Sequence, residues 1–200
     1  MDIIFSIAIL IMSVVIHEVS HGYAALFQGD PTAKHEGRLT LNPIKHLDPF
    51  GSFLVPLVTY LTAGFAFGWA KPVPYNPYNL RNQRWGELVV AIAGPISNIV
   101  IAVIFGLILR FYINVLPFST IQLMGFIVAI NLGLAVFNLI PIPPLDGSKV
   151  LFAFLPFRFR EFRHNLERYS FILIIIAVLI LPEFLSGIVS YLFGLITGLA

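Results

Sequence analysis

The sequence predicts an all-α polytopic membrane protein with about five transmembrane helices, a short membrane-associated strand region and a re-entrant segment. Of the 200 residues, 58% are hydrophobic and only 11% are charged, and the mean hydropathy is +0.90. Soluble domains carry about 25% charged residues, so this chain has too few charges to cover a surface in water. Uncharged stretches of about 20 residues, the length that spans a bilayer, recur along the chain, and basic residues gather in the loops between them.

The balance of residue types also excludes several functions. The net charge is +2 and the basic residues are spread over several loops, so no nucleic-acid partner is expected. The chain has no cysteine, which excludes a disulfide framework, a thiol nucleophile and a cysteine metal site. The lipid bilayer is the partner that the composition itself predicts.

Six apolar stretches define the predicted membrane segments. The first covers residues 3–16 and continues through two histidines and a glutamate to residue 27. The others cover residues 49–70, 88–109, 111–145, 169–182 and 184–200. Pro182 and Glu183 separate the last two, which predicts either a turn between two helices or a kink in one. We therefore expect a C-terminal helical segment or hairpin over residues 164–200.

Loop charge predicts the orientation of these segments. Residues 29–86 carry six basic side chains and residues 141–169 carry five, whereas residues 111–119 carry none. Because basic loops stay on the cytoplasmic side, both basic loops are expected there, and the N-terminus and residues 111–119 outside. This arrangement requires that residues 49–70 do not cross the membrane once. We predict that they form a re-entrant, interfacial or tight-hairpin segment.

Residues 37–43 alternate polar and apolar side chains and end at a proline. This pattern is typical of a short edge strand, and an exposed strand edge can pair with an extended peptide. Arg38 and Asn42 are therefore candidate substrate-binding residues. A plain cytoplasmic loop is the alternative.

The most informative motif is His17-Glu18-Val19-Ser20-His21, in the first membrane segment. On a helix, residues i and i+4 share one face, so both imidazoles can bind one metal ion, and Glu18 beside them can take a proton from water there. Charged side chains inside a membrane cost about 2.5–3.5 kcal/mol on insertion scales and need a partner, which a zinc ion supplies. Counting about 1.5 Å per residue from Ile3 places the motif in the cytoplasmic third of the membrane.

Asp146 is the candidate third ligand. Catalytic zinc sites use three protein ligands and keep one position for water, and the other histidines of this chain lie in charged loops. Asp146 instead follows a long uncharged stretch that ends in three prolines. Two crossings, over residues 87–110 and 120–140, return the chain to the side of His17, so Asp146 can join the histidines. A membrane-exit turn with an exposed aspartate is the alternative.

Four amide side chains lie inside the predicted membrane segments. For Asn138, eight residues before Asp146, we favour a catalytic role in holding substrate backbone or an oxyanion near the metal. Asn98 is a candidate either for substrate binding or for hydrogen bonding between helices. Gln122 and Asn131 are expected to be structural.

Together, these residues resemble the site-2 protease family of intramembrane zinc metalloproteases. Three motifs match in order: His17-Glu18-x-x-His21, Gly94-Pro95-x-x-Asn98 and Asn138-x-x-Pro141-x-Pro143-Pro144-Leu145-Asp146-Gly147. The resemblance covers about residues 3–156. It implies a compact prokaryotic-type member without PDZ or CBS domains, and residues 37–43 resemble the membrane-associated strand region of that family.

The resemblance implies one Zn²⁺ per chain, held by His17, His21 and Asp146, with Glu18 as the catalytic base and Asn138 assisting at the reacting carbonyl. It further implies hydrolysis of peptide bonds within or near the transmembrane segments of a membrane-protein substrate. Residues 1–200 then form a single integral-membrane metalloprotease domain with a catalytic core over residues 3–156. The expected location is the plasma membrane, with the active site toward the cytoplasm. The sequence specifies neither the substrate nor the oligomeric state.

Two other functions stay open at this point. A divalent-metal transporter would carry ligands on several spans along a path across the bilayer, whereas the candidate ligands here gather at one depth. A non-catalytic protein that binds membrane helices would not need His17, Glu18, His21 and Asp146 all intact.

Overall fold

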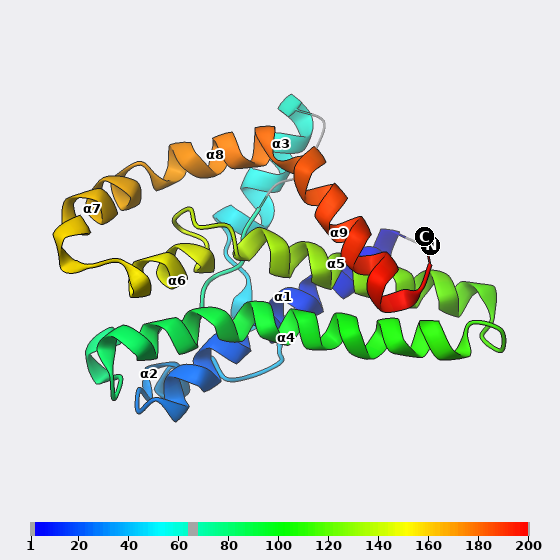
Figure 1. Ribbon diagram of the computed structural model, residues 1–200, viewed down its shortest axis with the longest axis horizontal. Helices are drawn as coiled ribbons and strands as arrows, with labels where there is room; N and C mark the ends of the chain where they lie inside the picture. The colour runs from blue at the N-terminus through cyan, green and yellow to red at the C-terminus, as the bar shows by residue number, and fades with distance from the viewer. Residues whose placement is uncertain (1–2, 64–67, 200) are drawn as a thin grey trace.

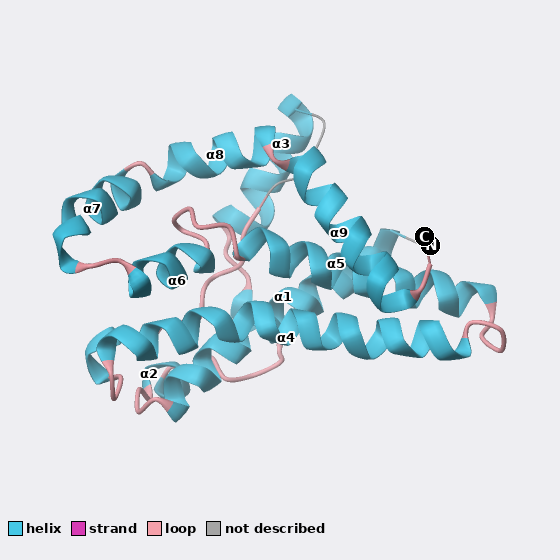
Figure 2. Ribbon diagram, viewed as in Figure 1, coloured by secondary structure: helices cyan, strands magenta, loops and turns pink. Residues whose placement is uncertain are grey.

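The computed structural model describes residues 3–63 and 68–199. Most of this part of the chain is helical (Figure 1, Figure 2). Three helices are long and apolar enough to cross a membrane: α1 (Ile3–Phe27), α4 (Gln83–Tyr112) and α5 (Phe118–Asn138). A bent pair, α8 (Ser170–Ile180) and α9 (Pro182–Thr197), adds a fourth if it is counted as one span. The all-helical multi-pass architecture agrees with the sequence, but the expected count of about five spans is not confirmed.

The core of the molecule forms around α4. This helix packs against α1, α5, α9 and the short helix α6 (Asp146–Phe154) (Figure 1). Between α4 and α5 lie the buried side chains of Ala102, Leu109, Val128 and Leu132. Large apolar side chains also cover the outside: Phe5 is 57% exposed and Phe171 is 68% exposed, as a lipid-facing surface requires.

The connection between α1 and α4 folds back on itself. It contains α2 (Thr32–His35), the 3₁₀ turns η1 (Pro43–His46) and η3 (Pro77–Asn79), the π-helical turn η2 (Phe50–Leu54) and α3 (Val55–Ala63). The nine residues of α3 are too few to span a bilayer. Past residue 67, the N–H of Trp69 donates to the carbonyl of Gly51 (3.0 Å) and the N–H of Lys71 to that of His46 (2.8 Å). The two ends of the apolar segment thus lie side by side, the arrangement that a re-entrant or hairpin segment requires.

The strand predicted over residues 37–43 is not confirmed, because the described residues contain no strand. Residues 38–42 run as irregular backbone, and a strand needs a neighbouring strand to bond its N–H and C=O groups. Burial also runs against the prediction: Arg38 is 5% exposed, whereas Leu41 is 55% exposed. Asn42 is the N-cap of η1, and its Oδ1 accepts the N–H of Ile44 (3.1 Å).

The C-terminal part is a bent pair of helices and not a hairpin. After the 3₁₀ turn η4 (Phe157–Phe159) and the polar helix α7 (Arg160–Arg168), α8 and α9 meet at an angle of 66°. Pro182 is the first residue of α9. Its ring nitrogen has no hydrogen to donate to the preceding turn, which ends α8 and suits the start of a new helix.

Asp30 fixes the end of α1. Its fully buried carboxylate accepts hydrogen bonds from the N–H of Asn76 (2.6 Å), from Nδ2 of Asn79 (2.9 Å) and from the N–H and hydroxyl of Thr32 (3.2 and 2.5 Å). Burial raises the pKa of Asp30, but these hydrogen bonds more than offset burial and hold the pKa below its ordinary value. Asp30 therefore ties α1 to the segment that precedes α4.

We expect Asp30→Ala to lower the free energy of unfolding by about 2–4 kcal/mol, because the donors of Asn76 and Asn79 lose their acceptor. Since the folded pKa is lowered, this contribution is present at neutral pH and is lost as the pH falls below about 3.9. Thermal unfolding in detergent at several pH values, followed by circular dichroism, measures this loss of stability. Glu36→Ala removes an exposed carboxylate of the same connection and should leave the unfolding temperature unchanged. Equal temperatures for Asp30→Ala and wild type would contradict this role.

Candidate metal centre

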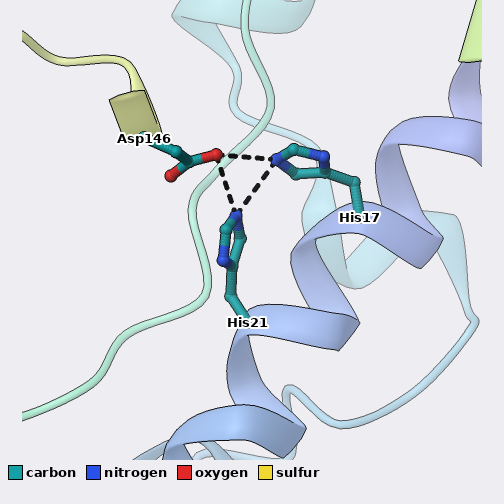
Figure 3. Close-up of side chains that lie close together, drawn as sticks. All are labelled: His17, His21 and Asp146. Atoms are coloured by element: carbon teal, nitrogen blue, oxygen red, sulfur yellow. Dashed lines mark hydrogen bonds and ion pairs between the residues drawn. The ribbon is translucent and has the colours of Figure 1, made fainter. Parts of the chain in front are cut away.

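Three side chains from two distant parts of the chain meet at one point (Figure 3). His17 and His21 lie one turn apart on α1, and Asp146 is the first residue of α6. His17 Nε2 lies 3.1 Å from Asp146 Oδ2, His21 Nε2 lies 3.2 Å from the same oxygen, and the two Nε2 atoms are 3.0 Å apart. None of the three residues is more than 8% exposed.

The outer ring nitrogens fix the protonation of both histidines. His17 Nδ1–H donates to Asn98 Oδ1 (2.6 Å), and His21 Nδ1–H donates to the backbone carbonyl of Val90 (2.7 Å), both on α4. A carbonyl oxygen only accepts, so each neutral ring carries its proton on Nδ1 and offers a lone pair on Nε2. The three atoms that face one another are therefore all acceptors.

This arrangement fits a zinc ion. Three acceptor atoms 3.0–3.2 Å apart repel one another unless a cation lies among them. Tetrahedral zinc, with bonds of about 2.0–2.1 Å, sets its ligand atoms about 3.3 Å apart, close to the spacing observed. Two imidazoles and a carboxylate are also a ligand set that catalytic zinc sites use, with one position left for water.

Gly94 allows α4 to pass close to the two histidines. A Cβ atom at this position would collide with Nε2 of His17 and of His21. Glycine is therefore required where α4 crosses the face of α1 that carries His17 and His21. Both motif residues of Gly94-Pro95-x-x-Asn98 thus lie against these histidines: Gly94 against both rings and Asn98 against His17.

The turn between α5 and α6 places Asp146. A Cβ atom at Gly147 would overlap the backbone carbonyls of Leu139 and Ile140, so only glycine lets α6 begin against the end of α5. The hydroxyl of Ser148 donates to the carbonyl of Leu145 (2.7 Å) and closes the first turn. Asp146 therefore enters the site from a backbone that is fixed on both sides.

Glu18 is half-buried, and its Oε2 accepts the N–H of Val73 (2.9 Å). Val73 lies in Lys71-Pro72-Val73-Pro74. The prolines hold the backbone extended and leave Val73 as the one N–H donor of residues 72–74. One carboxylate oxygen of Glu18 is thus oriented by a segment 55 residues away in sequence, a contact that the sequence analysis did not find.

Arg38 holds this extended segment in place. Its Nη2 donates to the carbonyl of Lys71 (2.8 Å) and to that of Pro72 (3.3 Å). Residues 71–73 are therefore fixed between Arg38 on one side and Glu18 on the other. A lysine-proline-valine-proline run was the pattern that could have identified this segment from the sequence.

The structure brings together His17, His21 and Asp146, with Asn98 behind His17. The Nδ2 of Asn138 donates to the carbonyl of Leu134 in its own helix (2.9 Å). Within the described residues, the hydrogen bonds of Asn138, Arg38 and Asn42 do not reach the three ligands.

Comparisons with known proteins identify the family of this chain. The chain matches the family described as peptidase family M50 over residues 5–120 and 113–182. It is 41% identical to "Putative zinc metalloprotease YwhC" of Bacillus subtilis over 84% of this chain and 76% of that protein. It is 31% identical to "Putative zinc metalloprotease Rip2" of Mycolicibacterium smegmatis over 90% and 68%, respectively. No solved structure matches the chain significantly. Because the family match covers most of the chain, this protein belongs to peptidase family M50.

Proposed function

We propose that His17, His21 and Asp146 hold the catalytic ion of this intramembrane zinc metalloprotease and that Glu18 is its general base. The observation that carries the proposal is the triangle of three buried acceptor atoms, 3.0–3.2 Å apart, whose histidine protons point away from its centre. The M50 family and the zinc metalloprotease names of its relatives support the activity.

Each side chain has a defined task in peptide hydrolysis. Zinc, when bound, supplies a Lewis acid that makes water nucleophilic near neutral pH. Glu18 accepts a proton from the attacking water as the bond between water oxygen and carbonyl carbon forms. It then returns the proton to the nitrogen as the C–N bond breaks. The hydrogen bond from Val73 to one carboxylate oxygen orients Glu18 and leaves the other oxygen for this work.

We further propose that Asn138 binds the oxygen of the reacting carbonyl. Its Nδ2 carries two hydrogens, and the bond to Leu134 uses one of them. The position of Asn138 at the last residue of α5, just before the turn to Asp146, supports this role.

The proposed substrate is a transmembrane segment of another membrane protein. Two of the proposed ligands lie on α1, and α4 passes them at Gly94. Both helices are long and apolar enough to cross a membrane, where a transmembrane segment is the peptide most readily present. Its carbonyls are bonded within its own helix, so it must unwind locally before hydrolysis. Arg38 would act on the substrate through the segment that it fixes at Lys71 and Pro72, and Asn42 is proposed to contact substrate directly.

We propose one domain over residues 1–200, with a catalytic core over residues 3–156, in the plasma membrane with its active site toward the cytoplasm. Packing of α6 and α9 on α4 supports the single domain. The basic residues of 29–86 and 141–169 support the orientation. The adjoining ends of 49–70 support a re-entrant segment. The proposed count of about five membrane segments takes α8 and α9 separately.

We expect Glu18→Gln to reduce cleavage by at least about 10²-fold and to leave one zinc per chain, because the amide cannot accept the proton and the ligands are unchanged. Purified protein in liposomes, with a panel of single-pass membrane substrates, measures cleavage, and elemental analysis measures zinc. A chelator should stop the wild type, and Glu36→Gln, at an exposed position, should cleave normally. Proteolysis by zinc-loaded Glu18→Gln at the wild-type rate would remove Glu18 from this role.

We expect Gly94→Ala to weaken zinc binding by at least about tenfold, since the added methyl group would occupy the space of the two ligand nitrogens. Competition with a chromophoric chelator measures the dissociation constant. Gly133→Ala is the matched control, because nothing lies within 4 Å of a Cβ atom there. Normal zinc affinity in Gly94→Ala would show that α4 does not pass the ligands this closely.

A further inference from the structure

His17 is the end of a buried chain of hydrogen bonds that crosses three helices. We propose that Asn131 on α5 and Ser13 on α1 are positioning residues for this ligand and that they act through Asn98 on α4. The inference rests on the proposed function, because it takes His17 as a zinc ligand. The sequence alone predicts a structural role for Asn131, whereas this inference gives it a role in metal binding.

The contacts form a continuous path. Asn98 Nδ2 donates to Asn131 Oδ1 (2.8 Å) and to the backbone carbonyl of Ser13 (3.3 Å). Asn131 Nδ2 donates to the hydroxyl oxygen of Ser13 (3.0 Å) and to the backbone carbonyl of Ile127 (2.8 Å). Asn98 and Asn131 are completely buried, and Ser13 is 4% exposed.

The path has a fixed direction because it begins at backbone carbonyls, which only accept. The carbonyl of Ile127 requires the NH₂ group of Asn131 to face it, which turns Asn131 Oδ1 toward Asn98. That oxygen, with the carbonyl of Ser13, requires the NH₂ group of Asn98 and turns Asn98 Oδ1 toward His17. The proton of His17 is thereby held on Nδ1.

The orientation of the Asn98 amide matters for metal binding. A reversed Asn98 amide would present its NH₂ group to His17 Nδ1, and the ring would then carry its proton on Nε2. Nε2 is the atom that lies 3.1 Å from Asp146 and 3.0 Å from the nitrogen of His21, and a protonated nitrogen cannot bind a metal. The orientation of Asn131, together with the backbone carbonyl of Ser13, therefore determines whether His17 offers a lone pair to the ion.

A purely structural role for Asn131 makes a different prediction. Amides that join membrane helices stabilise helix packing modestly, which affects unfolding and not the position of a proton on a ring of another helix. The two roles can be separated by measuring zinc affinity, the histidine tautomer and unfolding in the same variants.

The experiment compares Asn131→Leu, Asn98→Leu and the double variant, with Gln122→Leu as the control because Gln122 is exposed on the same helix as Asn131. Zinc dissociation constants come from chelator competition in detergent. We expect Asn131→Leu and Asn98→Leu each to weaken zinc binding by about 10–100-fold, as outer-shell partners of metal ligands do. The double variant should be no weaker than Asn98→Leu alone, because both changes act on one hydrogen bond. Gln122→Leu should bind zinc normally.

The tautomer of His17 is measured by ¹⁵N NMR of the zinc-free protein. We expect the Nδ1–H form in the wild type and a larger share of the Nε2–H form in Asn131→Leu. Asn131→Asp provides a second variant if Asn131→Leu does not fold: its carboxyl group keeps an acceptor for Asn98, and it should retain most of the zinc affinity.

Two results would overturn the inference: losses in log zinc affinity that add in the double variant, or a folded Asn131→Leu with normal zinc affinity and an unchanged His17 tautomer. His17→Ala separates these results from a failure of the proposed function. If His17→Ala loses zinc and Asn131→Leu does not, only the positioning role is wrong. If His17→Ala keeps zinc, the proposed metal site itself is wrong.

Discussion

The structure depends on placing three hydrogen-bond acceptor atoms, from His17, His21 and Asp146, within 3.2 Å of one another inside an apolar molecule. In water, such groups would be solvated separately, but in a low-dielectric interior their mutual repulsion is strong, and a cation must compensate it. Four elements are arranged around this requirement. Helix α1 carries His17 and His21 at i and i+4, α4 passes them at Gly94, α5 leads into the turn before α6, and α6 begins at Asp146.

Long membrane helices supply fixed backbone acceptors for controlling such a site. The carbonyl of Val90 sets the tautomer of His21 directly. The carbonyl of Ser13 is linked to His17 through the amide of Asn98, and the carbonyl of Ile127 is linked through the amides of Asn131 and Asn98. An exposed amide reverses readily because water satisfies either orientation, whereas a buried amide between fixed acceptors does not. Burial is therefore what allows a neutral side chain to hold a proton on one nitrogen of a distant ring.

The meeting of His17, His21 and Asp146 could be predicted from the sequence, because the evidence for it is either local or depends on counting membrane crossings. His17 and His21 have helical spacing, and Asp146 is an acidic residue after a long uncharged stretch. Alternation over residues 37–43 was misleading, because whether Arg38 is buried depends on carbonyls 33 residues away. The hydrogen bond between Val73 and Glu18 and the hydrogen bond between Asn98 and Asn131 also join residues far apart in sequence. No local spacing encodes such pairs, although the proline pattern around Val73 limits its conformation.

Charged residues are few in this chain, and each carboxylate near the site has specific partners. Asp146 faces the two histidines, Glu18 accepts a backbone N–H, and Asp30 accepts four hydrogen bonds at the end of α1. Glu18 and Asp30 bind the same extended stretch, at Val73 and at Asn76, so this stretch runs along the end of α1 that carries the metal ligands. The ligands are nearly inaccessible, but Glu18 is only half-buried. Lys71 and Pro72 are exposed, so the side of the site formed by Glu18 and residues 71–74 is where the buried centre meets a more open environment.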